Sequence, residues 1–361
     1  MSKVRHKIKG EVLDAATLQE RIAAGEFIED VSLAGVDLRG AKLCGGQLQN
    51  VDFSGAKLDG ADLRESIFAA CKFDGATMVG ADLRMALFGT CSFADVDAAE
   101  ARVSSVTMDS AKGKGLSLRG ADLRRSTFTR GEFEGLVLAG AQLESFSLLE
   151  CKVAGVDLRG TALVGSLMIG ADMREAKLEG ARLERVVFSD ANFAGADFSR
   201  LDAKICQFIK ADFQGTKLCG AKLERGNFQG AKLQGADLSQ ADLRSAMFVE
   251  ADLSGATLRQ ASLRQALFLD AVLEGSDLAQ ADLRETVFHR ARCAKARFVA
   301  ADLSYADFSG ADISEVDMSG AQVFRAKLHR VVDTNAVIPG RALTLGTDPE
   351  LAAAEGWEPK Y

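Results

Sequence analysis

The fold is decided by a stretch that begins at residue 31 and reads VSLAGVDLRGAKLCGGQLQN, up to residue 50. Leucine stands at every fifth position of it, from Leu33 to Leu48, and the same spacing continues to Leu328 without insertion or deletion. Of the 60 positions with this spacing, 57 are Leu, Phe, Met, Ile, Val or Cys, and the exceptions are Ala98, Gly113 and Ala203. A fixed short repeat of this kind dictates the fold.

Each five-residue unit has further fixed positions around its large central residue. A small residue, most often Ala, stands two positions before the centre, and Asp often stands directly before it, as in Ala61-Asp62-Leu63. Glycine recurs two positions after the centre, where 25 of the 35 glycines fall. The consensus A-D-L-x-G resembles the pentapeptide-repeat family over residues 31–330. The resemblance implies an all-β solenoid, a right-handed quadrilateral β-helix.

The periods of the sequence agree with such a coil. A period of five fits neither a helix nor a strand, but it fits a chain that turns a corner every five residues, with glycine at the corner where positive φ costs little. Every twentieth residue from Phe68 to Phe308 is mostly Phe, so four units make one coil. The array predicts about 15 coils, roughly 70 Å in length at the spacing of stacked strands. A leucine-rich repeat, the alternative, has a longer and asymmetric motif.

Composition changes at both ends predict three parts: a cap over residues 1–30, the β-helix over 31–330 and a tail over 331–361. The cap combines an alternating stretch, Val4 to Leu13, which predicts a strand, with a short helix over 14–24 that Asp14 or Thr17 caps. A second short helix begins near Pro349, with Leu351 and Trp357 as its apolar anchors. It either caps the last coil or forms a dimer contact. Some members of the resembled family pair through C-terminal helices, which implies a homodimer through the tail.

Composition also argues against several classes of function. A net charge of −7 argues against direct nucleic-acid binding, which requires a basic excess. We expect no membrane span, because the sequence contains no apolar run of sufficient length, and the basic N-terminus does not resemble a signal peptide. Five of the seven cysteines take inward positions, and only Cys44 and Cys219 should face outward. Buried thiols in such number predict a reducing, cytoplasmic location.

Residues with catalytic or metal-binding chemistry are sparse. The three histidines are His6, His289 and His329, and no Cys-x-x-Cys, His-Glu-x-x-His or Ser-His-Asp pattern accompanies them. We therefore expect no enzyme, no metal site and no cofactor. The many Asp residues before the centres belong to the repeat consensus and line the outer edges of the coils.

Two features stand out from the regular array. Arginines such as Arg64 and Arg84 follow one face at the 20-residue step, each two residues after an Asp. We interpret them as a neutralised, solubilising face, with a phosphate-binding track as the alternative. In residues 95–116 the centres Ala98 and Gly113 are too small, while Leu116 fills a small position. This coil is where we expect a kink or a bulge.

The candidate partner-binding residues lie near the end of the array. Residues 301–320 carry acidic side chains without a base, and the coil before them is basic. These acidic and basic collars either cancel as ion pairs or form a docking surface. The candidate residues are Asp302, Asp307, Asp312, Glu315, Asp317, Arg290, Arg292, Arg297 and Trp357.

The unbroken repeat favours a non-catalytic scaffold or adaptor that binds a protein partner through its outer faces or ends. The segment Leu13 to Gly45 is similar to pentapeptide-repeat regions of proteins associated with bacterial type VI secretion. The alternative is a DNA-mimicking dimer that binds DNA gyrase and protects against quinolones, as in the quinolone-resistance members of the resembled family. The resemblance implies a strongly acidic face for such DNA mimics. This chain is only mildly acidic and carries interspersed Arg, which argues against the alternative.

Overall fold

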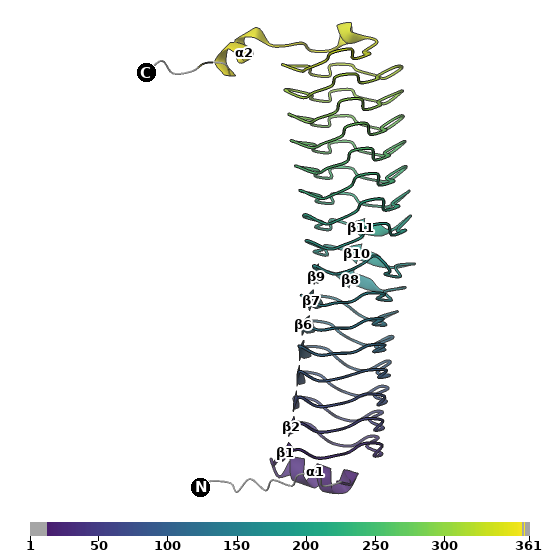
Figure 1. Ribbon diagram of the computed structural model, residues 1–361, viewed down its shortest axis with the longest axis vertical. Helices are drawn as coiled ribbons and strands as arrows, with labels where there is room; N and C mark the ends of the chain where they lie inside the picture. Colours follow the sequence, from purple (N-terminus) through teal and green to yellow (C-terminus); the bar gives the residue numbers. More distant parts are fainter. Residues whose placement is uncertain (1–12, 356, 358–361) are drawn as a thin grey trace. The chain divides into compact units, whose positions relative to one another are not determined.

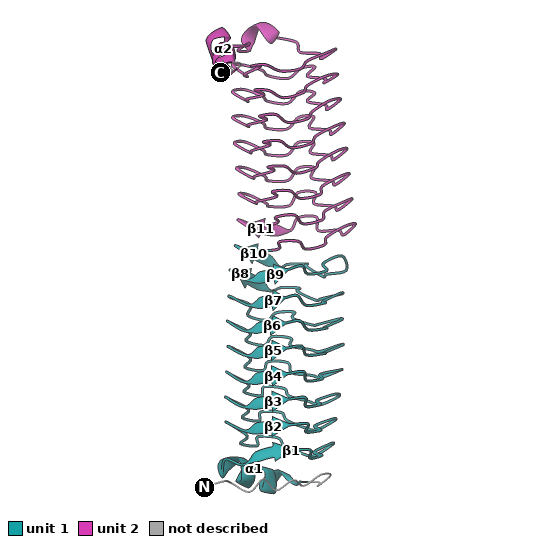
Figure 2. Ribbon diagram, turned by 60° about the vertical axis from the view of Figure 1, so that its left-hand side comes forward, with its two compact units in different colours: residues 1–187 teal, residues 188–361 magenta. Residues whose placement is uncertain are grey.

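The computed structural model of the chain describes residues 13–355 and residue 357. The chain divides into two compact units, residues 1–187 and 188–361 (Figure 2). The strand expected between Val4 and Leu13 falls almost wholly outside the described residues.

Both units are parallel β-solenoids in which each coil takes 20 residues (Figure 1). In the first unit the Leu33 N–H donates to the carbonyl of Asp52 at 2.7 Å, and the Asp52 N–H donates to the carbonyl of Val31 at 3.0 Å. In the second unit Phe193 and Asp212 repeat this arrangement. The expected fold class, an all-β solenoid with two short helices, is confirmed.

Regular strands mark only part of the array. An eight-stranded parallel sheet on one side of the first unit contains β1 (Phe27–Glu29), β2 (Gln47–Gln49), β3 (Ile67–Ala69), β4 (Leu87–Gly89), β5 (Thr107–Asp109), β6 (Thr127–Thr129), β7 (Ser147–Leu149) and β9 (Leu167–Ile169). On another side β10 (Arg182–Glu184) pairs with β8 (Ala162–Val164). The second unit contains β11 (Asp202–Lys204).

The predicted number of turns needs correction. Regular strands define about nine turns, nearly all in the first unit, whereas the sequence predicted fifteen coils. In most of the second unit single-residue bridges, such as Asp237 with Thr257, link successive coils instead of strands. The short straight segment between two corners explains the difference, because it leaves few consecutive residues to form a ladder.

The corners follow from a left-handed residue at nearly every fifth position. Gly55 has a φ of 64°, and the next residue, Ala56, donates its N–H to the carbonyl of Phe53 at 2.9 Å, which closes a β-turn. Glycine adopts this conformation without strain. Other residue types are forced into it by the surrounding coils, including the β-branched Ile205 with a φ of 58°.

The large central residues fill the interior in columns. In the second unit the rings of Phe188, Phe208, Phe228 and Phe248 stack with centroid separations of 5.6, 4.9 and 5.0 Å and nearly parallel planes. The column continues to Phe308, and its side chains are buried. Each ring therefore contributes about 1.5–3 kcal/mol of burial. The predicted stacking of like residues at the 20-residue step is confirmed.

The small inward positions are equally closed. Where Ser replaces Ala there, its hydroxyl finds a carbonyl, as when Ser66 Oγ donates to Leu43 O at 2.7 Å. The expected kink in residues 95–116 is wrong. Gly113 keeps its backbone bond to Glu132 at 2.8 Å, and the side chains of Leu116 and Phe133 occupy the space that a Cβ on Gly113 would need.

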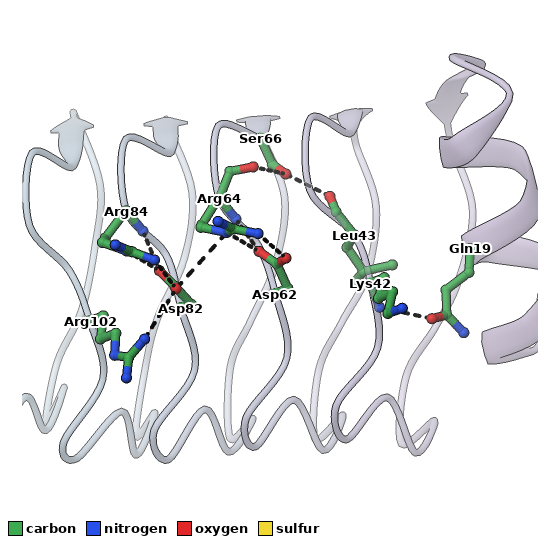
Figure 3. A network of polar contacts seen from close by, with 9 residues as sticks. All are labelled: Gln19, Lys42, Leu43, Asp62, Arg64, Ser66, Asp82, Arg84 and Arg102. Atoms are coloured by element: carbon green, nitrogen blue, oxygen red, sulfur yellow. Dashed lines mark hydrogen bonds and ion pairs between the residues drawn. The ribbon is translucent and has the colours of Figure 1, made fainter.

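The helix α1 (Ala15–Ala23) covers the open edge of the first coil. Asp14 accepts the Thr17 N–H at 2.8 Å, so it is the cap, and Leu18 and Ile22 are buried. The Gln19 side chain accepts the N–H of Lys42 at 2.8 Å (Figure 3). The helix thus satisfies backbone groups that an edge would leave unpaired.

The last coil ends differently. Lys327 bridges Leu345 after 18 residues, which shortens the final turn, and the short 3-10 helix η1 (Arg341–Leu343) lies within it. The helix α2 (Pro349–Glu355) follows, with the Asp348 side chain accepting the N–H of Glu350 at 2.9 Å. No side chain of α2 is buried, and Leu351 and Trp357 are 48% and 71% exposed, so they do not anchor the helix on the last coil of the single chain.

Candidate functional site

The arginine stripe is built from local pairs. Arg64 donates from Nε to Oδ1 of Asp62 at 2.8 Å and from Nη2 to Oδ2 at 2.7 Å (Figure 3). Arg84, Arg124, Arg244 and Arg284 repeat the geometry with the Asp two residues earlier. The side-chain hydrogen bond from Arg64 holds the pKa of Asp62 below its usual value. The predicted neutralisation of this face is confirmed.

The acidic collar encircles its coil. Asp302, Asp307, Asp312 and Asp317 each accept the backbone N–H of the serine two residues later, at 2.9–3.0 Å. They stand before the four centres of one coil, so they lie on its four different sides. The four aspartates therefore form the acidic collar that the sequence predicts, and their role in binding a partner stays a prediction.

The basic collar pairs with the coil before it. Arg290 binds Asp270 at 2.7 Å, Arg297 binds Asp277 at 3.3 Å, and Arg292 binds Glu274. Between the two collars only Arg284 and Asp302, at 3.7 Å, form an ion pair of permanently charged groups among the described residues, and the neighbouring His289 Nε2 lies 3.2 Å from Oδ2 of Asp307. The remaining acidic residues, Asp312, Glu315 and Asp317, make no ion pair within this part of the chain. Mutual cancellation of the collars is therefore incomplete.

A cavity of about 830 Å³ opens beside one side of these coils. Its wall contains Arg290 and Asp307 from the candidate set, and the tail residues Leu345 to Glu355 line the opposite edge. The hollow follows from the 20-residue step. His289, Ser309 and His329 share one column, and the small Ser309-Gly310 pair lies between two large neighbours in the coils before and after it.

Asp307 is the central charge of this cavity. Its carboxylate accepts the Ser309 N–H at 3.0 Å and the Ser309 hydroxyl at 2.6 Å, and Lys327 Nζ lies 3.2 Å away. Burial alone would raise the pKa of Asp307, but the hydrogen bonds from Ser309, with His289 and Lys327 close by, outweigh it and lower the pKa to about 2. The carboxylate is therefore charged at neutral pH.

The tail reaches the cavity through polar contacts. Glu355 Oε2 lies 3.2 Å from His329 Nε2 and 2.9 Å from Arg330 Nη1. On the other side of the same ring, the Asp348 N–H donates to His329 Nδ1 at 3.2 Å. The hydrogen bond from Arg330, followed by that from His329, lowers the pKa of Glu355. His329 is 6% exposed, so its ring is fixed between these two partners.

The sequence prediction missed most of this site. It selected Arg290 and Asp307 but not His289, Lys327, His329, Arg330 or Glu355. A signal was present, since His289 and His329 lie 40 residues apart, which is two coils, and must share a side. The tail's contribution had no such signal, because residues after the last repeat carry no register.

The part of the chain that the structure describes also bears on metal sites, membrane spans and thiols. No group of three or more His, Cys, Asp or Glu side chains there is placed to hold a metal ion. None of the described helices has the length and apolar character needed to cross a membrane. All seven cysteines are free thiols, five of them buried, with Cys44 exposed and Cys219 half-buried, as the repeat predicts.

The repeat and its coil define a pentapeptide-repeat solenoid. The family of pentapeptide repeats matches in eight copies, over residues 47–84, 151–190, 187–225, 227–265, 251–290, 266–304 and 291–330. The chain therefore belongs to this family. No curated protein matches the sequence.

Solved structures of the same family show low superposition scores. HetL, a pentapeptide repeat protein involved in heterocyst differentiation regulation from the cyanobacterium Nostoc sp. strain PCC 7120, is 20% identical, with 87% of this chain and 96% of HetL covered and a TM-score of 0.23. The plasmid-mediated fluoroquinolone resistance protein QnrB1 is 18% identical, with 68% of this chain and 94% of QnrB1 covered and a TM-score of 0.21. A pentapeptide repeat protein of the Arabidopsis thaliana thylakoid lumen is 31% identical, with 29% of this chain and 69% of the Arabidopsis protein covered and a TM-score of 0.23.

Proposed function

We propose that the chain is a non-catalytic scaffold or adaptor that binds a protein partner, acting in the bacterial cytoplasm. The observation that carries the proposal is the incomplete compensation of charge near the end of the array. Asp312 and Glu315 lie on one side of their coil without an ion pair among the described residues, while Arg292 beside them pairs with Glu274. Uncompensated charges fixed on a rigid surface steer and select a partner.

The proposal assigns a role to each of the three parts. The repeat array over residues 31–330 presents side chains at fixed spacing, while residues 1–30 and 331–361 close its ends and offer further docking surfaces. The similarity of Leu13 to Gly45 to proteins associated with type VI secretion favours a partner from that system. A homodimer through the tail would bury Leu351 and Trp357, which are exposed in the single chain, at the interface.

Capture by the full-length chain tests the adaptor role. A tagged chain would be used to isolate partners from the native bacterium, beside a variant with Asp312→Lys and Glu315→Lys. Ser314→Ala, on the same side of the same coil, is the matched control. We expect a protein that the wild type and Ser314→Ala retain and the charge-reversed variant loses. Equal retention by all three chains would contradict a role for this side.

A second assay distinguishes the adaptor from the alternative function, a DNA mimic that binds gyrase. In a DNA-supercoiling reaction with and without a fluoroquinolone, a DNA mimic would inhibit supercoiling or protect gyrase from the drug. Reversal of charge at Asp302, Asp307 and Asp312 would abolish this effect. Because these residues lie on different sides of the coil, and Arg284 of the coil before is paired with Asp302, the adaptor proposal expects no effect of the chain on supercoiling.

A further inference from the structure

The helix α2 is attached to the solenoid almost entirely by polar groups. None of its side chains is buried, and Leu351, which faces the cavity, remains half exposed. Its polar contacts are those of Glu355 with His329 and Arg330. Just before the helix, the Asp348 N–H donates to His329 Nδ1, and Thr347 Oγ1 accepts the N–H of Arg330. The Glu355–Arg330 ion pair is half exposed on both sides, and exposed ion pairs are individually weak. The helix is therefore held reversibly.

Two basic side chains of the last coil hold the carboxylate of Glu355. Arg330 and His329 converge on one oxygen of Glu355, at 2.9 and 3.2 Å. Arg330 has no other ion-pair partner among the described residues, whereas Lys327 is paired with Asp307 and Arg290 with Asp270. When Glu355 leaves, a guanidinium and a fixed imidazole are exposed at the mouth of the 830 Å³ cavity.

We propose that the His329–Arg330 pair is the docking site for an acidic segment of a partner protein, and that Glu355 of α2 occupies it as a tethered competitor. The inference rests on the proposed adaptor role and names the chemistry of its partner. A carboxylate from the partner takes the place of Glu355 between Arg330 and His329, at the edge of the cavity and away from the ionised Asp307 that Lys327 already neutralises.

The competition follows from the covalent tether. Only 25 residues separate Arg330 from Glu355, so the local concentration of the internal carboxylate is far above that of any free peptide. A free acidic segment must therefore displace it, and its apparent affinity falls by the fraction of molecules in which the site is open. Removing the internal carboxylate should restore that affinity.

Fluorescence anisotropy with the full-length chain tests the proposal. The probe is a short labelled peptide of alternating Glu and Ala, and its Gln counterpart is the control probe. We expect Glu355→Ala to bind the acidic probe at least about fivefold more tightly than the wild type, as expected for the loss of a weak internal competitor. Glu350→Ala removes the same charge from the same helix away from the site, and it should bind like the wild type.

Adding Arg330→Gln to Glu355→Ala should then abolish the gain in affinity for the acidic probe. Neither the single nor the double variant should change the binding of the Gln probe. Equal affinities of Glu355→Ala and Glu350→Ala would overturn the competition, and an undiminished affinity after Arg330→Gln would overturn the site. A separate result distinguishes failure of this docking site from failure of the adaptor role. If the native partner is captured equally by the wild type and by Arg330→Gln, the chain is an adaptor whose docking site lies elsewhere.

Discussion

At the scale of single residues, the small inward position sets the tightest limit on the sequence. Gly131 stands in such a position, and a Cβ there would lie 2.3 Å from a ring carbon of Phe133 and 3.1 Å from the carbonyl oxygen of Ala111. The Phe133 ring is fully buried and packs against Phe128, with ring centroids 5.3 Å apart. Close packing of this kind leaves no tolerance for an added methyl group.

We expect Gly131→Ala to lower the free energy of unfolding by about 1–3 kcal/mol, because the added methyl group overpacks the core. Gly89 provides the matched control, since its nearest neighbour in that direction is a carbonyl oxygen at 4.0 Å and its φ is not positive. Gly89→Ala should be neutral or stabilise the chain by about 0.4–1 kcal/mol. Chemical denaturation of both variants checks the ranking, and equal stabilities would show that the inward assignment of Gly131 is wrong.

Asp307 gives a pH dependence whose sign is fixed. Its pKa in the folded chain, about 2, lies below the ordinary value of 3.8. The ionised carboxylate therefore adds stability that is fully present above pH 4 and is lost as the pH falls through about 2. The difference in melting temperature between the wild type and Asp307→Asn should shrink as the pH is lowered from about 5 to about 2. A difference that does not change with pH would count against this account.

At the scale of elements, both helices were predictable in position and only one in packing. The spacing of Leu18 and Ile22 predicted a helix over 14–24 and its buried face, and α1 spans 15–23. Proline at the first helical position predicted the start of α2. Its contacts depend on Glu355 meeting His329 and Arg330 across the final shortened turn, which no local pattern encodes.

We expect Leu18→Ala to expose the first coil rather than unfold the whole chain. Truncating this fully buried side chain removes about 2–5 kcal/mol from the docking of α1. Because each coil contacts only its neighbours, the loss stays local. Hydrogen exchange at the amides of β1 and β2 should accelerate while that of residues 220–250 stays unchanged, and Glu20→Ala on the exposed face should change neither. Acceleration throughout the chain would contradict a local cap.

At the scale of the whole chain, the period predicted the class of fold and the identity of the interior columns. It worked because every unit meets the same steric problem, one large and one small side chain per straight segment, so Phe208 and Phe228 stack as their spacing demands. The number of turns was overestimated, fifteen against the about nine that regular strands define, since periodicity does not report how many consecutive residues form a ladder. The cavity was not predictable as a whole, because one of its edges comes from the tail.

The 20-residue return of the backbone, seen in the pairing of Asp237 with Thr257, also governs which insertions and deletions a gene can survive. Loss of residues 231–250 would bring the chain back in phase, with every later side chain in its former column and the distal surfaces merely one turn nearer to the start. Loss of a single five-residue unit would keep the interior filled yet turn all later surfaces by a quarter of a coil. Where two surfaces of the array must face the same way, related chains should therefore differ in length between those surfaces by whole coils of 20 residues.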